Sequence, residues 1–216
     1  MSTSLATHHL CKVTLLGNLV AKPEIRYLAN PVVAMAEVTL ATHSRWFDKQ
    51  SQQFKEWTHY HTVKVIGDLV DQTLLYAEKG EVMLIHGYLL NSKQTNREII
   101  HANFAQTFTK GYAQSINLVQ VSGELSSPIK LMTTEHDKLL GEGSITIKHQ
   151  VISPISGKLQ EFILSRIFHV WGKQAQYLHD HAKLGAQMVI EGKLSYMKNT
   201  EKTQFIESQQ TVLLPN

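Results

Sequence analysis

The sequence contains one cysteine and no long apolar run. Cys11 alone excludes an intrachain disulfide, and it excludes any zinc or iron–sulfur site that needs several cysteines. No segment approaches roughly 18 consecutive apolar residues, so no membrane-spanning helix is predicted. The first residues, MSTSLATHHLCK, do not place a basic region before an apolar run, so they predict no signal peptide. We therefore expect a reducing, cytoplasmic location.

Sequence motifs of common enzymes are also missing. The chain has no Walker-type phosphate loop, no H-E-x-x-H and no G-x-S-x-G. Carboxylates do not cluster in either half of the chain, as a metal-dependent nuclease would need. The GEG at 141–143 lacks the rest of a dinucleotide fingerprint, and we predict a hairpin turn there. The sequence therefore predicts a protein that is not an enzyme and that binds no cofactor.

Two groups of histidines are candidate metal ligands. His59 and His61 are two residues apart and would share one face of a strand, but no third ligand has a suitable spacing. His179 and His181 flank Asp180 on a predicted helix, where neighbouring side chains point apart, so a solvated face is favoured. We predict no metal site.

The net charge is small. The chain has 21 Lys and Arg against 18 Asp and Glu, which gives a net charge of +3 that permits a polyanionic partner without requiring one. The charges are spread over both halves, so any binding surface must come from local placement. A length of 216 residues allows one large domain or two small ones with a buried core.

An internal repeat decides between these arrangements. Glycines recur at one offset of 105 residues, with Gly67, Gly80 and Gly87 corresponding to Gly172, Gly185 and Gly192. Three glycines at one offset within matched apolar patterns indicate two copies of a domain of roughly 100 residues. We predict a first domain at residues 9–108, a linker at 109–115, and a second, diverged domain at 116–215.

Each copy has the same predicted order of elements. Three strands are expected at 12–19, 33–42 and 57–66, and in the second copy at 118–125, 143–150 and 162–171. A helix follows, which opens at Asp68 or Lys173 and closes before Gly80 or Gly185, because glycine is favoured just past a helix end. Two further strands complete each copy. The fold class is therefore all-β with one short helix per domain, and we predict tandem OB-folds, which are five-stranded Greek-key barrels; another small barrel or sandwich is the alternative.

Side chains alternate between two faces along the third strand of each copy. One face is apolar in both copies and is assigned to the barrel interior, with Val63 and Val65 matching Phe168 and Val170. The opposite face mixes rings and cations, namely Tyr60, Lys64, His169 and Trp171. Trp57 has the interior parity, so packing or a subunit contact is favoured for it. We expect Trp46, Tyr60 and Lys64 to belong to one nucleotide-facing surface.

Interleaved rings and cations are typical of proteins that bind single-stranded nucleic acid. Aromatic rings stack on unpaired bases, while Lys and Arg contact the phosphates. The candidate nucleic-acid-binding residues are Arg45, Trp46, Lys49, Phe54, Lys55, Tyr60, Lys64, Lys93, Lys148, Lys158, His169 and Trp171. Alternatives stay open for Trp46 as a core residue at the barrel lip, for Phe54 as a tucked loop anchor, and for each lysine as a solvated side chain.

Four stretches of the first copy resemble a known family, the bacterial single-stranded DNA-binding proteins (SSB). They are KVTLLGNLVAKPEIRY, VTLATHSRW, TVKVIGDL and YAEKGEVMLIHGYL, and the resemblance covers about residues 11–105. The second half resembles a diverged copy through SGELSSPIKL, SPISGKLQEF and HVWGKQAQYL. The resemblance implies sequence-nonspecific binding and protection of single-stranded DNA in replication, recombination or repair, without catalysis, in the bacterial cytoplasm and in association with the nucleoid.

The resemblance also implies roles for individual residues. Trp46 and Tyr60 stand where the family has stacking rings, and Ile66 and Gln94 stand where it often has further rings. In the second copy Trp171 takes the place of Ile66, whereas Val151 and Ser165 take the places of Trp46 and Tyr60. The two domains are therefore expected to bind DNA unequally.

Assembly and partners follow from the same resemblance. The common bacterial form is a tetramer of chains with one OB domain, so a chain with two predicts a homodimer. Many members end in a flexible tail with an acidic, apolar tip, whereas this sequence ends at ESQQTVLLPN, so recruitment through such a tip is not expected. Replication or recombination proteins remain candidate partners. The alternative function is an OB-fold interaction adaptor of a primosome or recombination complex that binds DNA only weakly.

Overall fold

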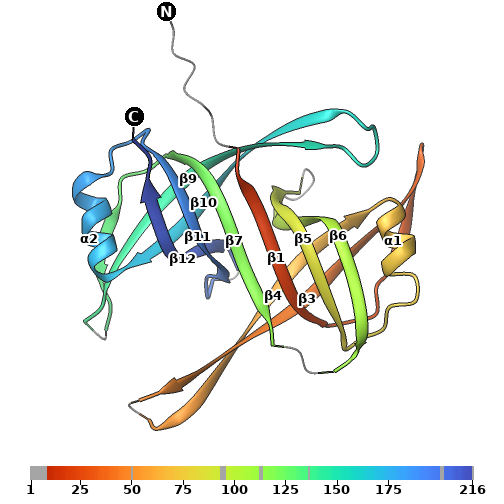
Figure 1. The fold of residues 1–216 in the computed structure, drawn as a ribbon, viewed down its shortest axis with the longest axis horizontal. Helices are drawn as coiled ribbons and strands as arrows, with labels where there is room; N and C mark the ends of the chain where they lie inside the picture. Colours follow the sequence, from red (N-terminus) through yellow and green to blue (C-terminus); the bar gives the residue numbers. More distant parts are fainter. Residues whose placement is uncertain are drawn as a thin grey trace, which may run out of the picture. The chain divides into compact units, whose positions relative to one another are not determined.

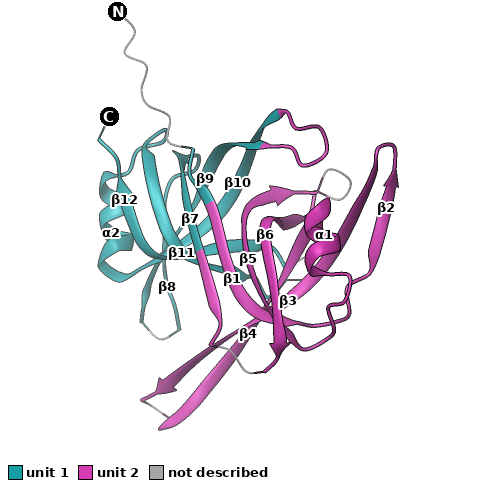
Figure 2. Ribbon diagram, turned by 45° about the vertical axis from the view of Figure 1, so that its right-hand side comes forward, with its two compact units in different colours: residues 1–11, 119–151, 159–216 teal, residues 12–118, 152–158 magenta. Residues whose placement is uncertain are grey.

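The chain consists of two compact units. A computed structural model describes residues 9–49, 51–92, 96–111, 114–135, 137–199 and 202–215. What we call the first unit comprises residues 12–118 and 152–158 (magenta, labelled unit 2 in Figure 2). The second unit comprises residues 1–11, 119–151 and 159–216 (teal, labelled unit 1 in Figure 2). The strand β6 ends at Lys110, two residues into the segment expected to be a linker, and β7 begins at Ile116, directly after that segment. The domain boundaries given above stay a prediction.

The first unit is a closed barrel with one helix. Its elements, among the residues described, are β1 (Cys11–Leu19), β2 (Ile25–Ala29), β3 (Val32–Asp48), β4 (Gln53–Ile66), α1 (Asp68–Thr73), β5 (Glu81–Asn91) and β6 (Glu98–Lys110) (Figure 1). Neighbouring strands follow the order β2-β3-β4-β6-β5-β1, and an additional pairing of β3 with β1 closes the sheet. The pairing of β4 with β6 is parallel, and the other pairings are antiparallel.

The second unit repeats this architecture. Its described elements are β7 (Ile116–Leu125), β8 (Lys130–Thr133), β9 (Leu139–Ile152), β10 (Leu159–Trp171), α2 (Gly172–His181), β11 (Gln187–Tyr196) and β12 (Gln204–Leu213). The order β7-β11-β12-β10-β9-β8 closes through a pairing of β7 with β9, and β10 pairs with β12 in parallel. Each unit is therefore a five-stranded barrel of the OB type with one helix between its third and fourth barrel strands, which confirms the predicted fold class.

The predicted interior face of the third barrel strand is confirmed in both units. Val63 and Val65 are fully buried, and so are Phe168 and Val170 in the second unit. Burying such side chains stabilises a fold by about 1.5–3 kcal/mol each. The alternation of buried and exposed positions along β4 and β10 thus places the core on one face of these strands and leaves the other face for contacts outside the barrel.

Glycines at repeated positions allow strands to approach closely where each barrel closes. A Cβ on Gly17 would collide with the carbonyl oxygen of Ala41, and a Cβ on Gly123 would collide with that of Thr146. These contacts lie beside the β1–β3 and β7–β9 pairings that close the barrels. The recurrence of glycine at this point of the sequence is therefore a consequence of barrel closure.

The two helices end earlier than predicted. The helix α1 stops at Thr73 and α2 at His181, so Gly80 and Gly185 do not terminate them. Both glycines instead have positive φ values, 87° and 82°. Their backbone N–H groups donate to the carbonyls of Leu19 and Leu125 at 2.8 and 3.0 Å. Each glycine lies in a turn that leads into the fourth barrel strand. Such a turn favours glycine because of its positive φ, and a helix end favours glycine for the same reason.

Other differences concern the strands. The short strands β2 and β8 were missed, because each is a brief partner of a long strand without an apolar repeat of its own. The GEG segment lies inside β9 and is not a hairpin turn. A Cβ on Gly143 would come within 2.6 Å of Ile129 Cδ1 and 2.9 Å of Phe168 Cζ, so glycine leaves room for core side chains there.

Candidate nucleic-acid interface

The strands β3 and β4 form a long hairpin in the first unit. Their pairing runs without interruption from Met35 opposite Ile66 to Asp48 opposite Gln53. The loop predicted between the second and third strands is therefore mostly strand. In Figures 1 and 2 the end of this hairpin runs past the other strands of its barrel. Side chains along this extension have no barrel interior to pack against, so both of its faces are available for contacts.

Aromatic rings are concentrated on this hairpin. Trp46 is 46% exposed, Phe54 61% and Tyr60 56%, so none of these rings is a core residue. Phe47 packs edge to face on Phe54 with ring centroids 5.3 Å apart. Trp57 has the interior parity that was predicted, but it is 45% exposed because β4 extends beyond the barrel at that point. Trp57 therefore adds a ring that the sequence interpretation assigned to packing or a subunit contact.

The strand register divides the rings between two faces of the hairpin. Residues that pair directly across an antiparallel ladder share a face. Trp46 pairs with Lys55, and the next but one residue of β4, Trp57, lies on the same face. Tyr60 pairs with Ala41 and lies on the opposite face, together with Phe47 and Phe54. The expectation that Trp46 and Tyr60 share one surface is therefore wrong, because the hairpin register gives them opposite directions.

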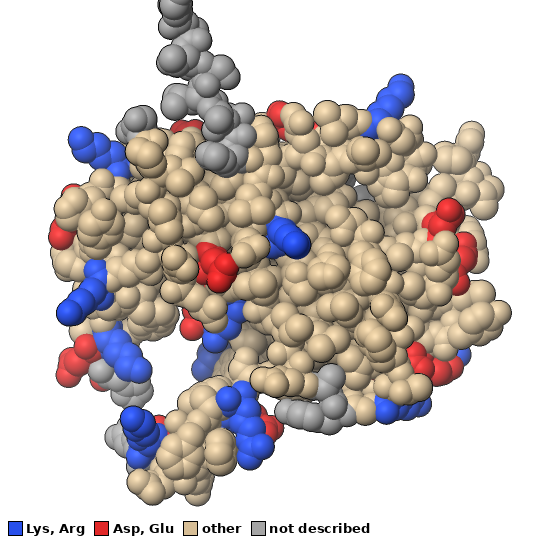
Figure 3. Space-filling model, in the orientation of Figure 1, with Lys and Arg blue, Asp and Glu red and all other residues tan. Residues whose placement is uncertain are grey.

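The cations of the hairpin are paired with acidic side chains. Arg45 Nε lies 3.6 Å from Glu56 Oε1, and its guanidinium carbon lies 4.3 Å from the centroid of the Phe54 ring. Lys55 forms an ion pair with Asp48, and Lys49 is exposed in the turn. Exposed ion pairs of this kind contribute only about 0–1 kcal/mol, so a phosphate can replace the carboxylate at little cost. Figure 3 shows Lys and Arg side chains on the lobe that this hairpin forms at the lower left.

A histidine cluster lies at the base of the hairpin. His61 is fully buried, and its Nε2 lies 2.8 Å from Thr42 Oγ1. Burial, with a smaller contribution from the nearby His59, lowers the pKa of His61 to about 3. His43 Nδ1 lies 2.9 Å from Thr58 Oγ1. No group of three or more His, Cys, Asp or Glu side chains suited to a metal ion occurs among the described residues.

A polar cavity of about 390 Å³ lies beside Lys64 in the first unit. Lys22 and Arg26 also line it, and neither was among the predicted site residues. Lys64 pairs across the sheet with Glu37, which itself forms an ion pair with Arg97. Lys22 holds Glu78 at 2.7 Å, and this hydrogen bond lowers the pKa of the Glu78 carboxyl. Only the fold brings these cations together, since β2 and β4 are distant in sequence. Lys93 and Gln94 lie outside the described residues.

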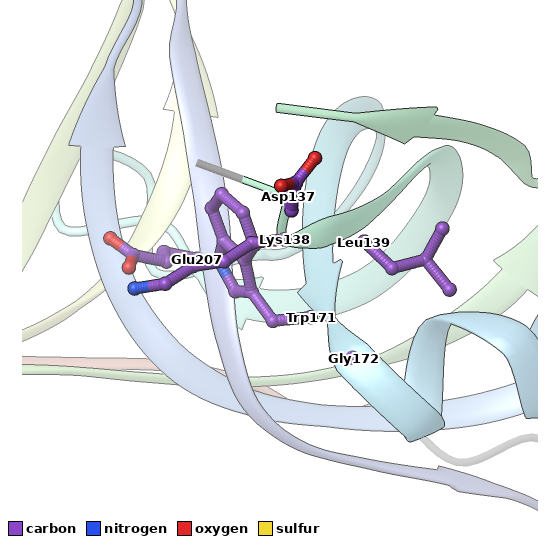
Figure 4. Close-up of a pocket in the computed structure, with 6 residues that line it drawn as sticks. All are labelled: Asp137, Lys138, Leu139, Trp171, Gly172 and Glu207. Carbon is purple, nitrogen blue, oxygen red and sulfur yellow. The ribbon is translucent and has the colours of Figure 1, made fainter. Parts of the chain in front are cut away.

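The second unit presents fewer aromatic rings. Trp171, at the end of β10, is 39% exposed and lines a cavity of about 730 Å³ (Figure 4). His169 is mostly buried, with its Nε2 3.0 Å from Glu142 Oε2 and its ring 4.3 Å from that of Phe205. Lys148 and Lys158 are exposed. The hairpin formed by β9 and β10 carries exposed aliphatic side chains where the first unit has rings: Ile152, Leu159 and Ile163.

Within the described ranges, neither α1 nor α2 is long and apolar enough to cross a membrane.

The fold and this hairpin define a tandem OB-fold protein that displays rings and cations together. Residues 10–107 match the single-strand binding protein family. The wild-type single-stranded DNA binding protein from Thermus aquaticus has a similar structure, with a TM-score of 0.78 at 18% identity over 97% of this chain and 95% of that chain. A deletion mutant of the same protein gives 0.77 at 19% identity, over 96% and 95% of the two chains. At this identity the likeness shows the fold of both halves and no more.

Proposed function

We propose that this protein binds single-stranded DNA without sequence specificity and protects it during replication, recombination or repair. The observation that carries the proposal is the exposed set of rings and cations on the β3–β4 hairpin, within a domain of the single-strand binding protein family. Unpaired bases stack on such rings with about 1–3 kcal/mol per base, whatever the base, so the binding tolerates any sequence. The adjacent Lys and Arg side chains neutralise phosphates and release counterions.

The proposed contacts extend over both units. Rings at Trp46, Phe54, Tyr60 and Trp171 stack on bases. Phosphates are held by Arg45, Lys49, Lys55, Lys64, Lys93, Lys148 and Lys158, and His169 lines the path of the strand. Because Trp46 and Tyr60 lie on opposite faces of the hairpin, a bound strand passes around its edge or follows one face only. The first unit, which carries more exposed rings, binds the larger share of the DNA.

The proposal also covers how the chains assemble and where in the cell the protein acts. Two chains with two OB domains each form a homodimer with four domains, and the linker at 109–115 separates the domains of one chain. The protein acts by binding, with no catalytic step. It works in the bacterial cytoplasm on nucleoid DNA, where single strands arise during replication and repair.

An adaptor role is a second candidate, and it concerns the β9–β10 hairpin. Exposed aliphatic side chains at Ile152, Leu159 and Ile163 stand on it where the β3–β4 hairpin has rings, and they suit a protein partner better than a base. In this version the second unit docks a replication or recombination protein while the first unit holds DNA.

A fluorescence titration tests DNA binding by the whole chain. Adding oligo(dT) is expected to quench tryptophan emission, since bases stack on Trp46 of the β3–β4 hairpin. The logarithm of the affinity is expected to fall with the logarithm of salt concentration, with a slope of about −0.7 per phosphate contact. Absence of quenching, together with a Kd weaker than ~10 µM at low salt, would rule the proposal out.

A further inference from the structure

The cavity beside Trp171 has a charged wall in addition to its ring. Its lining consists of Asp137, Lys138, Leu139, Trp171, Gly172 and Glu207, all of the second unit, and its volume is about 730 Å³. Figure 4 shows Glu207 and Lys138 among the side chains around Trp171, with the carboxylate and the ammonium at the ends of side chains that extend to one side of the indole. The volume is in the range of sites that hold small ligands, so a nucleobase fits. A base stacked on Trp171 would therefore share its cavity with a carboxylate.

The strand register places Glu207 on the same face of the sheet as Trp171. His169 of β10 pairs with Glu207 of β12, so the two side chains project from the same face of the sheet. Trp171 follows His169 by two residues and shares that face. On the other side of β12, Lys193 of β11 pairs with Glu207. Glu207 therefore belongs to a row of side chains on one face of the sheet, together with His169 and Lys193, and Trp171 lies on the same face.

One oxygen of Glu207 is left for a ligand. Ser195 Oγ donates to Glu207 Oε2 at 3.2 Å, and Lys193 Nζ lies 3.4 Å from the same oxygen. No described residue donates to Oε1. The side chain is about one-third exposed, so a ligand in the cavity can reach it. The two contacts on Oε2 orient the carboxylate, and Oε1 remains an acceptor that a base can use.

A carboxylate oxygen distinguishes bases by their donors. It accepts hydrogen bonds and donates none, so it pairs with the exocyclic amino group of cytosine, adenine or guanine. Thymine has no amino group, and its single N–H donor is flanked by two carbonyl oxygens that a carboxylate repels. The arrangement at Glu207 therefore favours amino-bearing bases over thymine.

The first unit lacks this arrangement. The residue that corresponds to Glu207 by strand pairing is His101, which pairs with Lys64 as Glu207 pairs with His169. His101 is 6% exposed and stacks on Tyr88 with ring centroids 5.0 Å apart. Ile66 stands in the place of Trp171. A base beside this strand of the first unit meets no carboxylate acceptor at that position.

We infer that the cavity formed by Trp171 and Glu207 is a nucleobase subsite that discriminates against thymine, so that the second unit selects amino-bearing bases while the first unit tolerates any base. This inference rests on the proposed function, because it requires that the chain binds single-stranded DNA. It adds a base preference to one of the two units.

The test compares two pyrimidine oligonucleotides of equal length, oligo(dC) and oligo(dT), with the full-length chain. The affinity ratio of oligo(dC) to oligo(dT) is measured for the wild type, for Glu207→Gln and for Glu191→Gln. The glutamine at position 207 can donate to thymine O4, so the ratio is expected to fall about tenfold, as expected for loss of a hydrogen bond to a charged acceptor. Glu191→Gln removes the same charge from the second unit, on a residue that contacts Gln120 and lies outside the cavity, so it leaves the ratio unchanged.

The outcomes separate the two proposals. A ratio that falls in Glu207→Gln alone supports the subsite. A ratio that is equal in all three proteins, or that falls equally in both variants, overturns the subsite and leaves DNA binding intact. Failure of the folded wild type to bind either oligonucleotide overturns both proposals. Circular dichroism melting of each variant verifies that the barrels are folded.

Discussion

Buried histidines make the stability of the first unit depend on pH at the level of single residues. Burial lowers the pKa of His61 to about 3 and that of His101 to about 4, with smaller effects from His59 and Lys64 respectively. In an unfolded chain histidine titrates near pH 6.5. Because the folded pKa lies below the unfolded value, the unfolded chain takes up protons first as the pH falls. Stability is therefore complete above about pH 6.5 and is lost progressively as the pH falls from there toward 3.

The variant His61→Gln tests this dependence. Glutamine does not titrate and can still hydrogen bond with Thr42 Oγ1, which lies 2.8 Å from His61 Nε2. Between pH 7 and pH 5 the wild type is expected to lose about 2 kcal/mol more unfolding free energy than the variant. Urea denaturation at the two pH values measures the difference. Equal losses in the two proteins would mean that His61 is not buried neutral in the folded state.

Some residues of the core and of the candidate site can be identified from the sequence alone, and others cannot. The alternation along 57–66 was enough to identify Val63 and Val65 as core residues, because parity follows directly from strand geometry. Lys22 and Arg26 were missed, because they join Lys64 at one cavity only after β2 pairs with β3. Glu207 was missed for the same reason, since no spacing relates it to Trp171.

The β3–β4 hairpin is the element on which the proposed function mainly depends. Its rings are exposed and its register sets them on two faces, so removing one ring should affect binding more than folding. An OB barrel without this extension would retain its core, because the buried side chains of β3 and β4 lie in the barrel segments of these strands.

The variant Trp46→Ala tests the hairpin as a binding element. Loss of one stacking ring is expected to weaken oligo(dT) binding about 5- to 100-fold, which corresponds to about 1–3 kcal/mol. The melting temperature should change little, because Trp46 is 46% exposed. Filter binding and thermal denaturation measure the two effects. Tyr76→Ala is the matched control, since Tyr76 is an 85% exposed ring of the same unit that lies outside the hairpin.

The result can contradict the proposal in two ways. If Trp46→Ala unfolds the first unit, Trp46 is a core residue of the barrel lip. If both variants weaken binding equally, the hairpin has no special part in it.

Element lengths were harder to predict than element order. The order of strands and helices followed from the repeat, whereas the extension of β3 to Asp48 did not, because its side chains show no apolar alternation. Outside the barrel such a strand is held by its ladder partner alone. Its rings and charges therefore looked like those of a loop.

At the scale of the whole molecule, two OB units in one chain bear on assembly. A chain of 24.4 kDa that forms the proposed homodimer should give a light-scattering mass of about 49 kDa, twice the chain mass. The mass should remain near this value over a tenfold dilution in the micromolar range, because a homodimer that supplies the binding unit must persist at working concentrations. A mass of one chain at every concentration would contradict the dimer.

The sequence by itself was sufficient for the repeat, the barrel class, the core face of the third strand and the family match of residues 10–107. These features depend on local rules, namely strand parity, glycine spacing and the repeated order of elements along the chain. The tertiary structure alone placed Trp46 and Tyr60 on opposite faces, gathered Lys22, Arg26 and Lys64 at one cavity, and set Glu207 beside Trp171. These features depend on the register between strands, which hydrogen bonds between distant segments decide and no single stretch of sequence contains.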